Sequence, residues 1–341
     1  MGPTMSDVAR RAGVSRALVS IVMRGVPGAS EQTRARVLAV ARDLGYVPDA
    51  AARRLSRVRS GGSGALGVVF GVGHAFHQDL LERLYAHRGS FDLVLSGVTA
   101  QRSQEEAIET ALRERCEGVI VLGSPAGPQD WAVLARRIPV VSVLRDVRAA
   151  GVDRVVTHEE AGMGLAVDHL VRVGHLRIVH VHGGSAPGAR ARHRGHDEAM
   201  RAAGLPVGAA IAGGLTEEEG ARAADELLTR GVGGPGAPTA VTVFNDRCAL
   251  GLVDRLRSRD VRVPHDLCVV GFDDIRAAGY AHVGLTTIRQ DADRLAALAV
   301  ERVAQRIGAP ARRARRDVVT PELVLRSTTA PPADRPVRSA T

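Results

Sequence analysis

The sequence predicts a small all-α domain with a helix-turn-helix, followed by a short helix, a linker and an α/β body of two parallel-sheet subdomains. Three observations predict this arrangement. Residues 1–64 contain 11 Arg against four acids, whereas the other 277 residues are nearly balanced, which is typical of a small basic module on a neutral body. From residue 65 onward, apolar runs alternate with amphipathic helical patterns, as in parallel sheets covered by helices. These roughly 265 residues exceed what one such sheet usually holds.

The composition favours an acidic partner such as nucleic acid, because 46 basic residues face 37 acidic ones and the net charge is +9. All the basic residues are Arg, so codon preference explains part of this total and a single Arg is a weak signal. The three Cys are scattered and are expected to be buried, reduced thiols. The sequence contains no membrane-length apolar run and begins without an export signal, so we expect a cytoplasmic protein without membrane contact, metal or cofactor.

Capping signals predict two short helices near the N-terminus. Thr4 and Asp7 have the spacing of a capping box, and Gly13 is placed to end the first helix. Ser15 is expected to cap a second helix, residues 16–23, so that a tight Gly-containing turn joins the two. The pattern directs some side chains to the core, namely Val14, Val19, Val22 and Met23, and others outward, namely Arg16, Ala17, Ser20 and Ile21.

A third helix is expected between Ser30 and Gly45. Its apolar stripe consists of Val37, Leu38, Ala41 and Leu44. Asp49 then caps a short Ala- and Arg-rich helix, which is marginal alone in water, and the run SGGSG at 60–64 is a flexible linker. These signals predict a helix-turn-helix domain at 1–48, a hinge helix and linker at 49–64, a body at 65–330 and a Pro-rich tail at 331–341, which lacks heptads for a coiled coil.

The body is expected to contain strands where short apolar runs occur, at 65–72, 91–97, 118–123, 140–144, 177–183, 240–244 and 267–272. Helical patterns lie between them, the clearest at 104–115 and 217–230. Ligands of open α/β sheets bind beyond the carboxyl ends of the strands, so polar residues that follow these runs are candidates for a binding cleft.

Two sets of motifs resemble the lactose-repressor/galactose-repressor (LacI/GalR) family of bacterial regulators. The first is DVARRAGVS at 7–15, TRARVLAVARDLGYVPD at 33–49 and AARRL at 51–55. The second lies in the body and includes GVIVLGSP, GLAVDHLVRVGHLRIVHVHGG, PTAVTVFNDRCALGLV and VRVPHDLCVVGFDDI. The resemblance implies a bilobal body of the periplasmic-binding-protein-like (type I) fold. The chain would then cross between the lobes near 144–158, 271–276 and 318–322.

For DNA, hydroxyls at helix starts and on the exposed face suit phosphate oxygens. These candidates are Thr4, Ser15, Ser20, Ser30 and Thr33, with Arg24 as a further DNA-binding residue. The resemblance implies base contacts from Arg16, Ala17 and Ile21. Arg16 could contact guanine while Ala17 and Ile21 contact thymine methyls, or Ile21 could be a core residue that contacts no DNA. In the hinge, the resemblance implies that Leu55 enters a minor-groove base step beside Arg53 and Arg54, although Leu55 could instead be an exposed linker residue.

For a small molecule, the candidates around the interlobe cleft are Phe76, Ser124, Asp146, His158, Arg192, Asn245 and Asp273. The resemblance implies that Arg192 and Asp273 grip the ligand. Three of the candidates have alternative roles: Asn245 could simply cap a helix, Asp273 could, with Asp274, cap a helix or bridge the lobes, and His158 could be a surface or hinge residue.

The predicted function is a transcriptional regulator, most often a repressor in this family, that binds a near-palindromic operator as a homodimer. A small-molecule effector such as a sugar, a nucleoside or a related metabolite would modulate it. The body alone would also suit a solute-binding protein or an enzyme. Against these stand the basic helix-turn-helix and the lack of a nucleophile elbow, a P-loop or a metal motif.

Overall fold

The computed structural model describes residues 3–23, 27–46, 64–123, 128–232, 234 and 236–332. The chain divides into two compact units, Met1–Gly64 and Ala65–Thr341, which are described separately. Among the described residues, no helix is both long and apolar enough to cross a membrane.

The described residues of the N-terminal unit form three helices: α1 (Met5–Ala12), α2 (Arg16–Met23) and α3 (Glu31–Asp43). The predicted capping box is present, because the Thr4 side chain accepts from the Asp7 amide and Asp7 accepts from the Thr4 amide. The three helices enclose a small core that includes Val8, Val19 and Val37. One part of the predicted stripe is wrong: Leu38 is 41% exposed, and its neighbours along α3, Val37, Val40 and Ala41, face the core instead.

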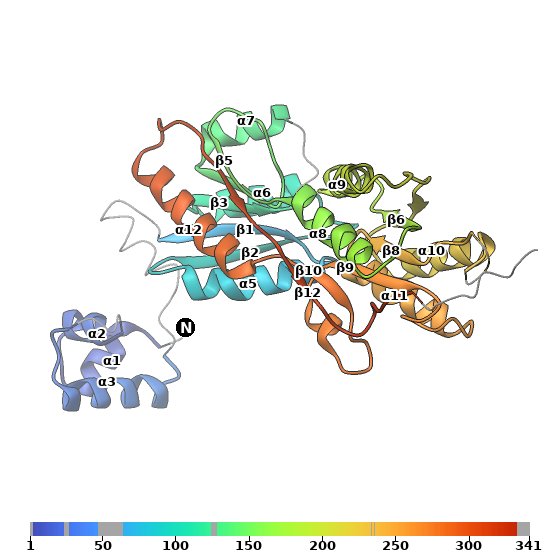
Figure 1. Ribbon diagram of the computed structural model, residues 1–341. Helices are drawn as coiled ribbons and strands as arrows, with labels where there is room; N and C mark the ends of the chain where they lie inside the picture. Colours follow the sequence, from blue (N-terminus) through green and yellow to red (C-terminus); the bar gives the residue numbers. More distant parts are fainter. Residues whose placement is uncertain are drawn as a thin grey trace, which may run out of the picture. The chain divides into compact units, whose positions relative to one another are not determined.

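The first lobe of the body is a parallel six-stranded sheet in the order β11-β5-β4-β3-β1-β2. Its strands are β1 (Ala65–Gly71), β2 (Asp92–Val98), β3 (Gly118–Leu122), β4 (Val140–Val143), β5 (Val152–Thr157) and β11 (Arg316–Val319). Helices α5 (Ala75–His87) and α12 (Ala292–Gly308) pack on one face, and α6 (Gln104–Arg113) and α7 (Pro128–Arg137) on the other (Figure 1).

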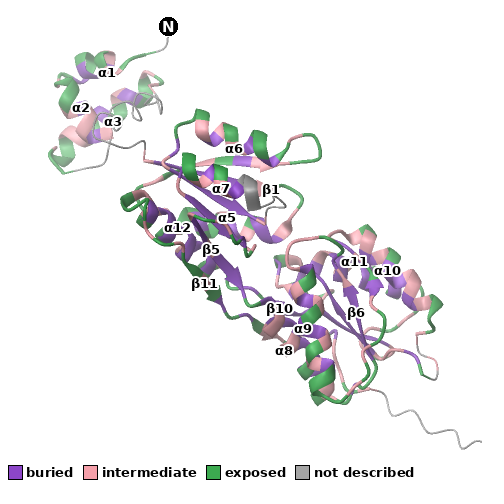
Figure 2. Cartoon of the chain, turned by 90° about the horizontal axis from the view of Figure 1, so that it is seen from above, coloured by how far each residue is buried: buried purple, intermediate pink, exposed green. Residues whose placement is uncertain are grey.

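The second lobe is a six-stranded sheet in the order β12-β10-β9-β8-β6-β7. Its strands are β6 (Ile178–His182), β7 (Ile211–Ala212), β8 (Ala240–Val243), β9 (Cys268–Asp273), β10 (Thr286–Arg289) and the antiparallel β12 (Glu322–Val324). Helices α8 (Glu159–Arg172) and α9 (Ala189–Ala202) cover one face, and α10 (Glu217–Thr229) and α11 (Asp246–Arg257) the other. Buried residues follow the strands at the centre of each lobe (Figure 2).

Two helices of the second lobe touch backbone to backbone. A Cβ atom added to Gly220 of α10 would lie 1.9 Å from the carbonyl oxygen of Cys248, and one added to Gly251 of α11 would lie 1.9 Å from that of Glu217. Only Gly leaves room for this approach, so these two positions fix the distance between α10 and α11.

The chain crosses between the lobes three times. The first crossing lies between β5 and α8, and the third, at 319–322, lies between β11 and β12, which confirms both predictions. The predicted crossing at 271–276 is wrong. After β9 the chain passes through the short 3-10 helix η1 (Arg276–Gly279) into β10 of the same sheet, and it crosses only at 289–292, before α12.

Candidate binding sites

Helix α2 is positioned by its cap and by the apolar side chains beneath it. The Ser15 hydroxyl oxygen accepts a hydrogen bond from the Leu18 amide, 3.2 Å away, and Arg16 and Ala17 point into solvent. Ile21 is half-buried, and a Cβ on Gly28 would lie 3.5 Å from its Cγ2 atom. The outward face predicted for Arg16 and Ala17 is therefore present, whereas Ile21 lies at the boundary between the core and the surface.

Ser20 is half-buried within α2, and the other described DNA candidates of the N-terminal unit lie at helix starts. The Thr4 hydroxyl donates to Asp7 Oδ2 at 2.6 Å, and the Ser30 hydroxyl donates to Thr33 Oγ1 at 2.9 Å. These hydroxyls thus orient the first turns of α1 and α3, where backbone N–H groups also point outward. Four predicted residues, Arg24, Arg53, Arg54 and Leu55, lie outside the described residues, as does the predicted hinge helix.

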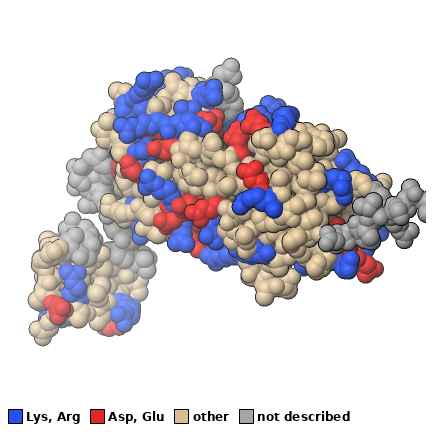
Figure 3. All heavy atoms as spheres, viewed as in Figure 1, with Lys and Arg blue, Asp and Glu red and all other residues tan. Residues whose placement is uncertain are grey.

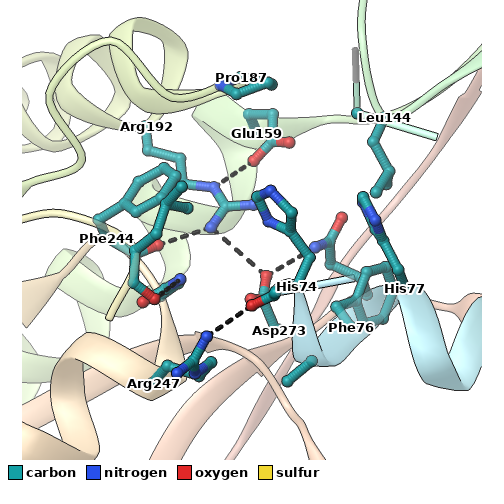
Figure 4. A pocket seen from close by; sticks show the side chains of 16 residues that line it. His74, Phe76, His77, Leu144, Glu159, Pro187, Arg192, Phe244, Arg247 and Asp273 are labelled. Carbon is teal, nitrogen blue, oxygen red and sulfur yellow. Dashed lines mark hydrogen bonds and ion pairs between the residues drawn. The ribbon is translucent and has the colours of Figure 1, made fainter. Parts of the chain in front are cut away.

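A narrow cleft lies between the two lobes of the body. Its lining contains four of the predicted ligand residues, Phe76, Arg192, Asn245 and Asp273. It also contains His74, His77, Leu144, Glu159, Pro187, Leu215, Phe244, Arg247 and Gln290, with three Gly or Ala residues. Figure 4 shows these side chains converging from both lobes.

Arg192 of α9 is the buried cation at the centre of the cleft. Its Nε donates to Glu159 Oε2 at 2.5 Å, and its Nη1 donates to the Phe244 carbonyl at 2.6 Å and lies 3.4 Å from Asp273 Oδ1 (Figure 4). Its guanidinium lies over the Phe272 ring, 3.6 Å from the ring centre. Burial alone would lower the pKa of Arg192, but Glu159 and Asp273 outweigh burial and raise it, so the side chain stays charged.

Asp273 ends β9 with a φ of 120°, a backbone conformation that is uncommon for a residue other than Gly. Its Oδ1 accepts a hydrogen bond from Gln290 Nε2 at 2.7 Å. Burial raises the pKa of its carboxyl to about 7, and Arg192 limits that rise. A strained backbone and an acid near neutrality are both typical of ligand sites.

Asn245 has two roles in the structure. Its Oδ1 accepts from the Cys248 amide at 2.9 Å and so caps α11, and its Nδ2 donates to the Leu215 carbonyl at 3.2 Å. It also lines the cleft. The predicted capping role is therefore confirmed, although the Asn245 amide remains at the edge of the binding space.

Two imidazoles form the wall of the cleft in the first lobe. The rings of His74 and His77 are stacked, with centres 4.6 Å apart. Burial, together with the neighbouring His74, lowers the pKa of His77 to about 3, and burial followed by Arg247 lowers that of His74. Both rings are therefore neutral at physiological pH and offer ring faces and one hydrogen-bonding nitrogen each.

Two predicted ligand residues do not line the cleft. Asp146 lies in the loop after β4, where Arg154 Nη1 at 3.0 Å and Arg316 Nε at 2.9 Å hold its carboxylate towards β5 and β11. His158 is exposed at the start of α8, where its amide donates to the Val319 carbonyl. Placing His158 in the cleft was an error, because a position after a strand does not fix where its side chain points. Asp146 instead lines an adjoining pocket between the lobes, which shares Leu144, Glu159 and Pro187 with the cleft. Ser124 lies outside the described residues.

Several cleft residues were not predicted. Glu159, Phe244, Arg247 and Gln290 were not singled out, although Phe244 and Arg247 lie in the motif PTAVTVFNDRCALGLV, because their partners lie far away in sequence. Arg247, for example, donates to the Gly73 carbonyl at 2.5 Å from the opposite lobe. Among the described residues, no group of three or more His, Cys, Asp or Glu is arranged to hold a metal ion. On the visible face of the body, acidic and basic side chains lie side by side (Figure 3).

Comparisons with known proteins cover nearly the whole chain. The family model "Bacterial regulatory proteins, lacI family" matches residues 4–49, and "Periplasmic binding protein-like domain" matches residues 167–329. The HTH-type transcriptional regulator GalR of Salmonella typhimurium (strain SL1344) is 32% identical over 339 residues, which is 97% of each chain.

Two solved structures show the same architecture. A LacI transcriptional regulator from a Rhodococcus species is 42% identical, has a TM-score of 0.74, and matches over 78% of this chain and 98% of its own. The lac repressor dimer bound to operator and the anti-inducer ONPF is 26% identical, has a TM-score of 0.73, and matches over 97% of this chain and 100% of its own.

Proposed function

This chain belongs to the lacI family of bacterial regulatory proteins, and on that premise we propose that it represses transcription under the control of a small molecule bound in the interlobe cleft. It is a sequence-specific DNA-binding regulator that acts as a homodimer on an operator, and its relatives are regulators rather than enzymes. We place its action in the cytoplasm, where the DNA is, and assign the hinge to residues 49–64.

The observation that carries the DNA role is α2, which turns Arg16 and Ala17 outward beside a helix start capped by Ser15. In a dimer, two such helices enter successive major grooves, about one helical turn apart, so the operator has two-fold symmetry. We propose that Arg16 makes the polar base contact, Ala17 and the exposed part of Ile21 contact thymine methyls, and hydroxyls at helix starts position the phosphates. Arg24, Arg53, Arg54 and Leu55 remain predictions from the sequence.

The cleft supports an uncharged, hydroxyl-bearing effector. Both cations among the described residues of the cleft are already paired, Arg192 with Glu159 and Asp273 and Arg247 with Glu217, so neither is left unpaired to bind an anionic ligand. Buried carboxylate and amide groups such as Asp273 and Asn245 suit hydroxyl donors, while Phe76 and the stacked imidazoles offer apolar faces. A sugar or a nucleoside has this mixture of groups.

The test uses the DNA immediately upstream of the gene. Anisotropy titrations of the full-length protein should give sub-micromolar binding to a two-fold site, roughly a thousandfold tighter than binding to a scrambled duplex. The affinity should fall linearly with the logarithm of salt concentration, because phosphate contacts release counterions.

Arg16→Ala should bring the operator and the scrambled duplex closer together in affinity. Arg222→Ala, the control, removes one exposed Arg from α10 in the body and should change neither the affinity for the operator nor that for the scrambled duplex. Equal affinity of the unmodified protein for both duplexes would reject the function.

A further inference from the structure

Five side chains connect the cleft to the segments that cross between the lobes. The Thr157 hydroxyl donates to Gln290 Oε1 at 2.6 Å, and Gln290 Nε2 donates to Asp273 Oδ1 at 2.7 Å. Arg192 lies 3.4 Å from the same Asp273 oxygen and donates to Glu159, which follows Thr157 by two residues. These contacts close a circle, which we call the hinge ring: Thr157, Glu159, Arg192, Asp273 and Gln290.

The hinge ring touches all three crossings. Thr157 ends β5 at the first crossing, and Gln290 lies in the second, between β10 and α12. His158, between Thr157 and Glu159, donates its amide to the Val319 carbonyl at 2.9 Å, which ties the third crossing to the first. A change at Asp273 therefore has a short, hydrogen-bonded route to every segment that must bend when the lobes move.

Gln290 is the link between the cleft side of the ring and the crossing side. It is only 4% exposed, and both ends of its amide are engaged. Asp273 Oδ1 also faces the Arg192 guanidinium and therefore accepts, so the Gln290 NH₂ faces Asp273 and its oxygen accepts from Thr157. A ligand hydroxyl that donates to Asp273 competes with this NH₂ for the carboxylate oxygen. Leaving a buried amide without a hydrogen-bond partner costs free energy, so the Gln290 side chain is expected to shift when it loses this bond.

The exposed contacts between the lobes are weaker alternatives. Arg276 of η1 pairs with Glu82 of α5, but these side chains are 69% and 61% exposed. Exposed ion pairs contribute little and are screened by salt, whereas four members of the hinge ring are buried and the side chain of the fifth, Asp273, is only 12% exposed. The buried ring is thus the stronger connection.

We propose that Gln290 is a positioning residue that transmits changes at Asp273 in the cleft to the crossing segments and, through them, to operator binding. The last step rests on the proposed function. Binding at the cleft and binding at the operator are then linked reciprocally, with Gln290 in the shared element.

The test needs no identified effector, because Asp273→Asn replaces the carboxylate that a ligand would engage. The readout is native-state hydrogen exchange of the His158 amide in the full-length protein, which reports the bond to Val319. Asp273→Asn should speed this exchange by about five- to tenfold, the worth of one buried hydrogen bond. In the Gln290→Leu background, Asp273→Asn should speed exchange of the His158 amide by less than about twofold.

Thr157→Val removes the hydrogen bond between Thr157 and Gln290, so it should also abolish the effect of Asp273→Asn on exchange of the His158 amide. This second variant provides the test if Gln290→Leu does not fold. Arg276→Ala, on the exposed pair, is the control and should leave the effect intact. The proposal is overturned if Asp273→Asn leaves the His158 amide unchanged, or if its effect is the same with and without Gln290.

Operator titrations of the same proteins separate the two levels of the proposal. We expect Asp273→Asn to change operator affinity, and to change it much less in the Gln290→Leu background. Coupled exchange without any effect on operator affinity would overturn the link to DNA while leaving the ring in place. Absence of operator binding in every protein, the unmodified one included, would instead count against the proposed function.

Discussion

Two opposing effects set the pKa of the Asp273 carboxyl. Burial raises its pKa from 3.8 in water to about 7, and Arg192 limits the rise by favouring the charged form. Between these two values the folded protein binds more protons than the unfolded chain does. The contribution of Asp273 to stability is therefore fully present below about pH 4 and is lost as the pH rises through 7.

Asp273→Asn should remove this dependence, because an amide does not titrate in this range. We expect the free energy of unfolding in urea to decline less between pH 5 and pH 8 in the variant than in the unmodified protein. Asp254→Asn, at an exposed position of α11, is the matched control and should keep the original slope. Parallel slopes for Asp273→Asn and the unmodified protein would show that this carboxyl does not titrate near neutrality.

Single residues also show where sequence reasoning about the site succeeds. Arg192, Asn245 and Asp273 were predicted from motifs that follow strands or open helices, and the structure brings all three to the cleft. Gln290 and Glu159 were missed because their roles depend on partners 133 and 33 residues away, Thr157 and Arg192. Such pairs are set by the crossing of the chain between lobes, which no local pattern encodes.

Among the elements, α10 and α11 depend on each other most directly. Each carries a Gly at the point where the other helix's carbonyl oxygen approaches to within 1.9 Å of where a Cβ would be. The obstructing carbonyl oxygens belong to the backbone of the first turn of each helix, so they cannot rotate away as a side chain could.

Gly251→Ala should therefore lower the free energy of unfolding by about 1–3 kcal/mol, since the two helices must separate to admit a methyl group. Gly164→Ala in α8 is the control: nothing lies within 4 Å of its added Cβ. That variant should be unchanged or more stable by about 0.5–1 kcal/mol, because Ala favours helix over Gly. Similar urea-unfolding curves for the two variants would contradict the steric role of Gly251.

Some strands were predicted from apolar runs in the sequence, and others were missed. All seven predicted apolar runs are strands. Six of them lie inside a sheet and are buried on both faces, whereas β2 lies at an edge. β5 was missed because its run is interrupted by Asp153, which is fully buried in an ion pair with Arg306 at 2.7 Å. β10 begins with two buried Thr, and the short edge strands β11 and β12 carry charged residues, so none of them forms an apolar run.

For the molecule as a whole, regulation requires that the body influence the DNA-binding domain through residues 49–64, of which 49–63 lie outside the described residues. If Leu55 enters a base step, it contributes to specific binding only, because Leu55 reaches that step only when the dimer is correctly docked on the operator. Leu55→Ala should weaken operator binding by about tenfold or more while leaving binding to scrambled DNA within about twofold.

Leu325→Ala, at a Leu of the body that is 60% exposed, is the matched control and should leave both affinities unchanged. An equal loss on operator and scrambled DNA in the Leu55 variant would assign Leu55 to the linker rather than to the groove.

The order in which the two lobes can be completed during synthesis follows from the second and third crossings. The lobe that begins at residue 65 still lacks α12, whose Leu295 and Val303 belong to its core, and the edge strand β11 until residue 319 has left the ribosome. The other lobe already has five of its six strands and all four of its covering helices by residue 289. The lobe that is encoded first is thus the one that is finished last, and a chain truncated before residue 292 would expose the sheet face that α12 covers.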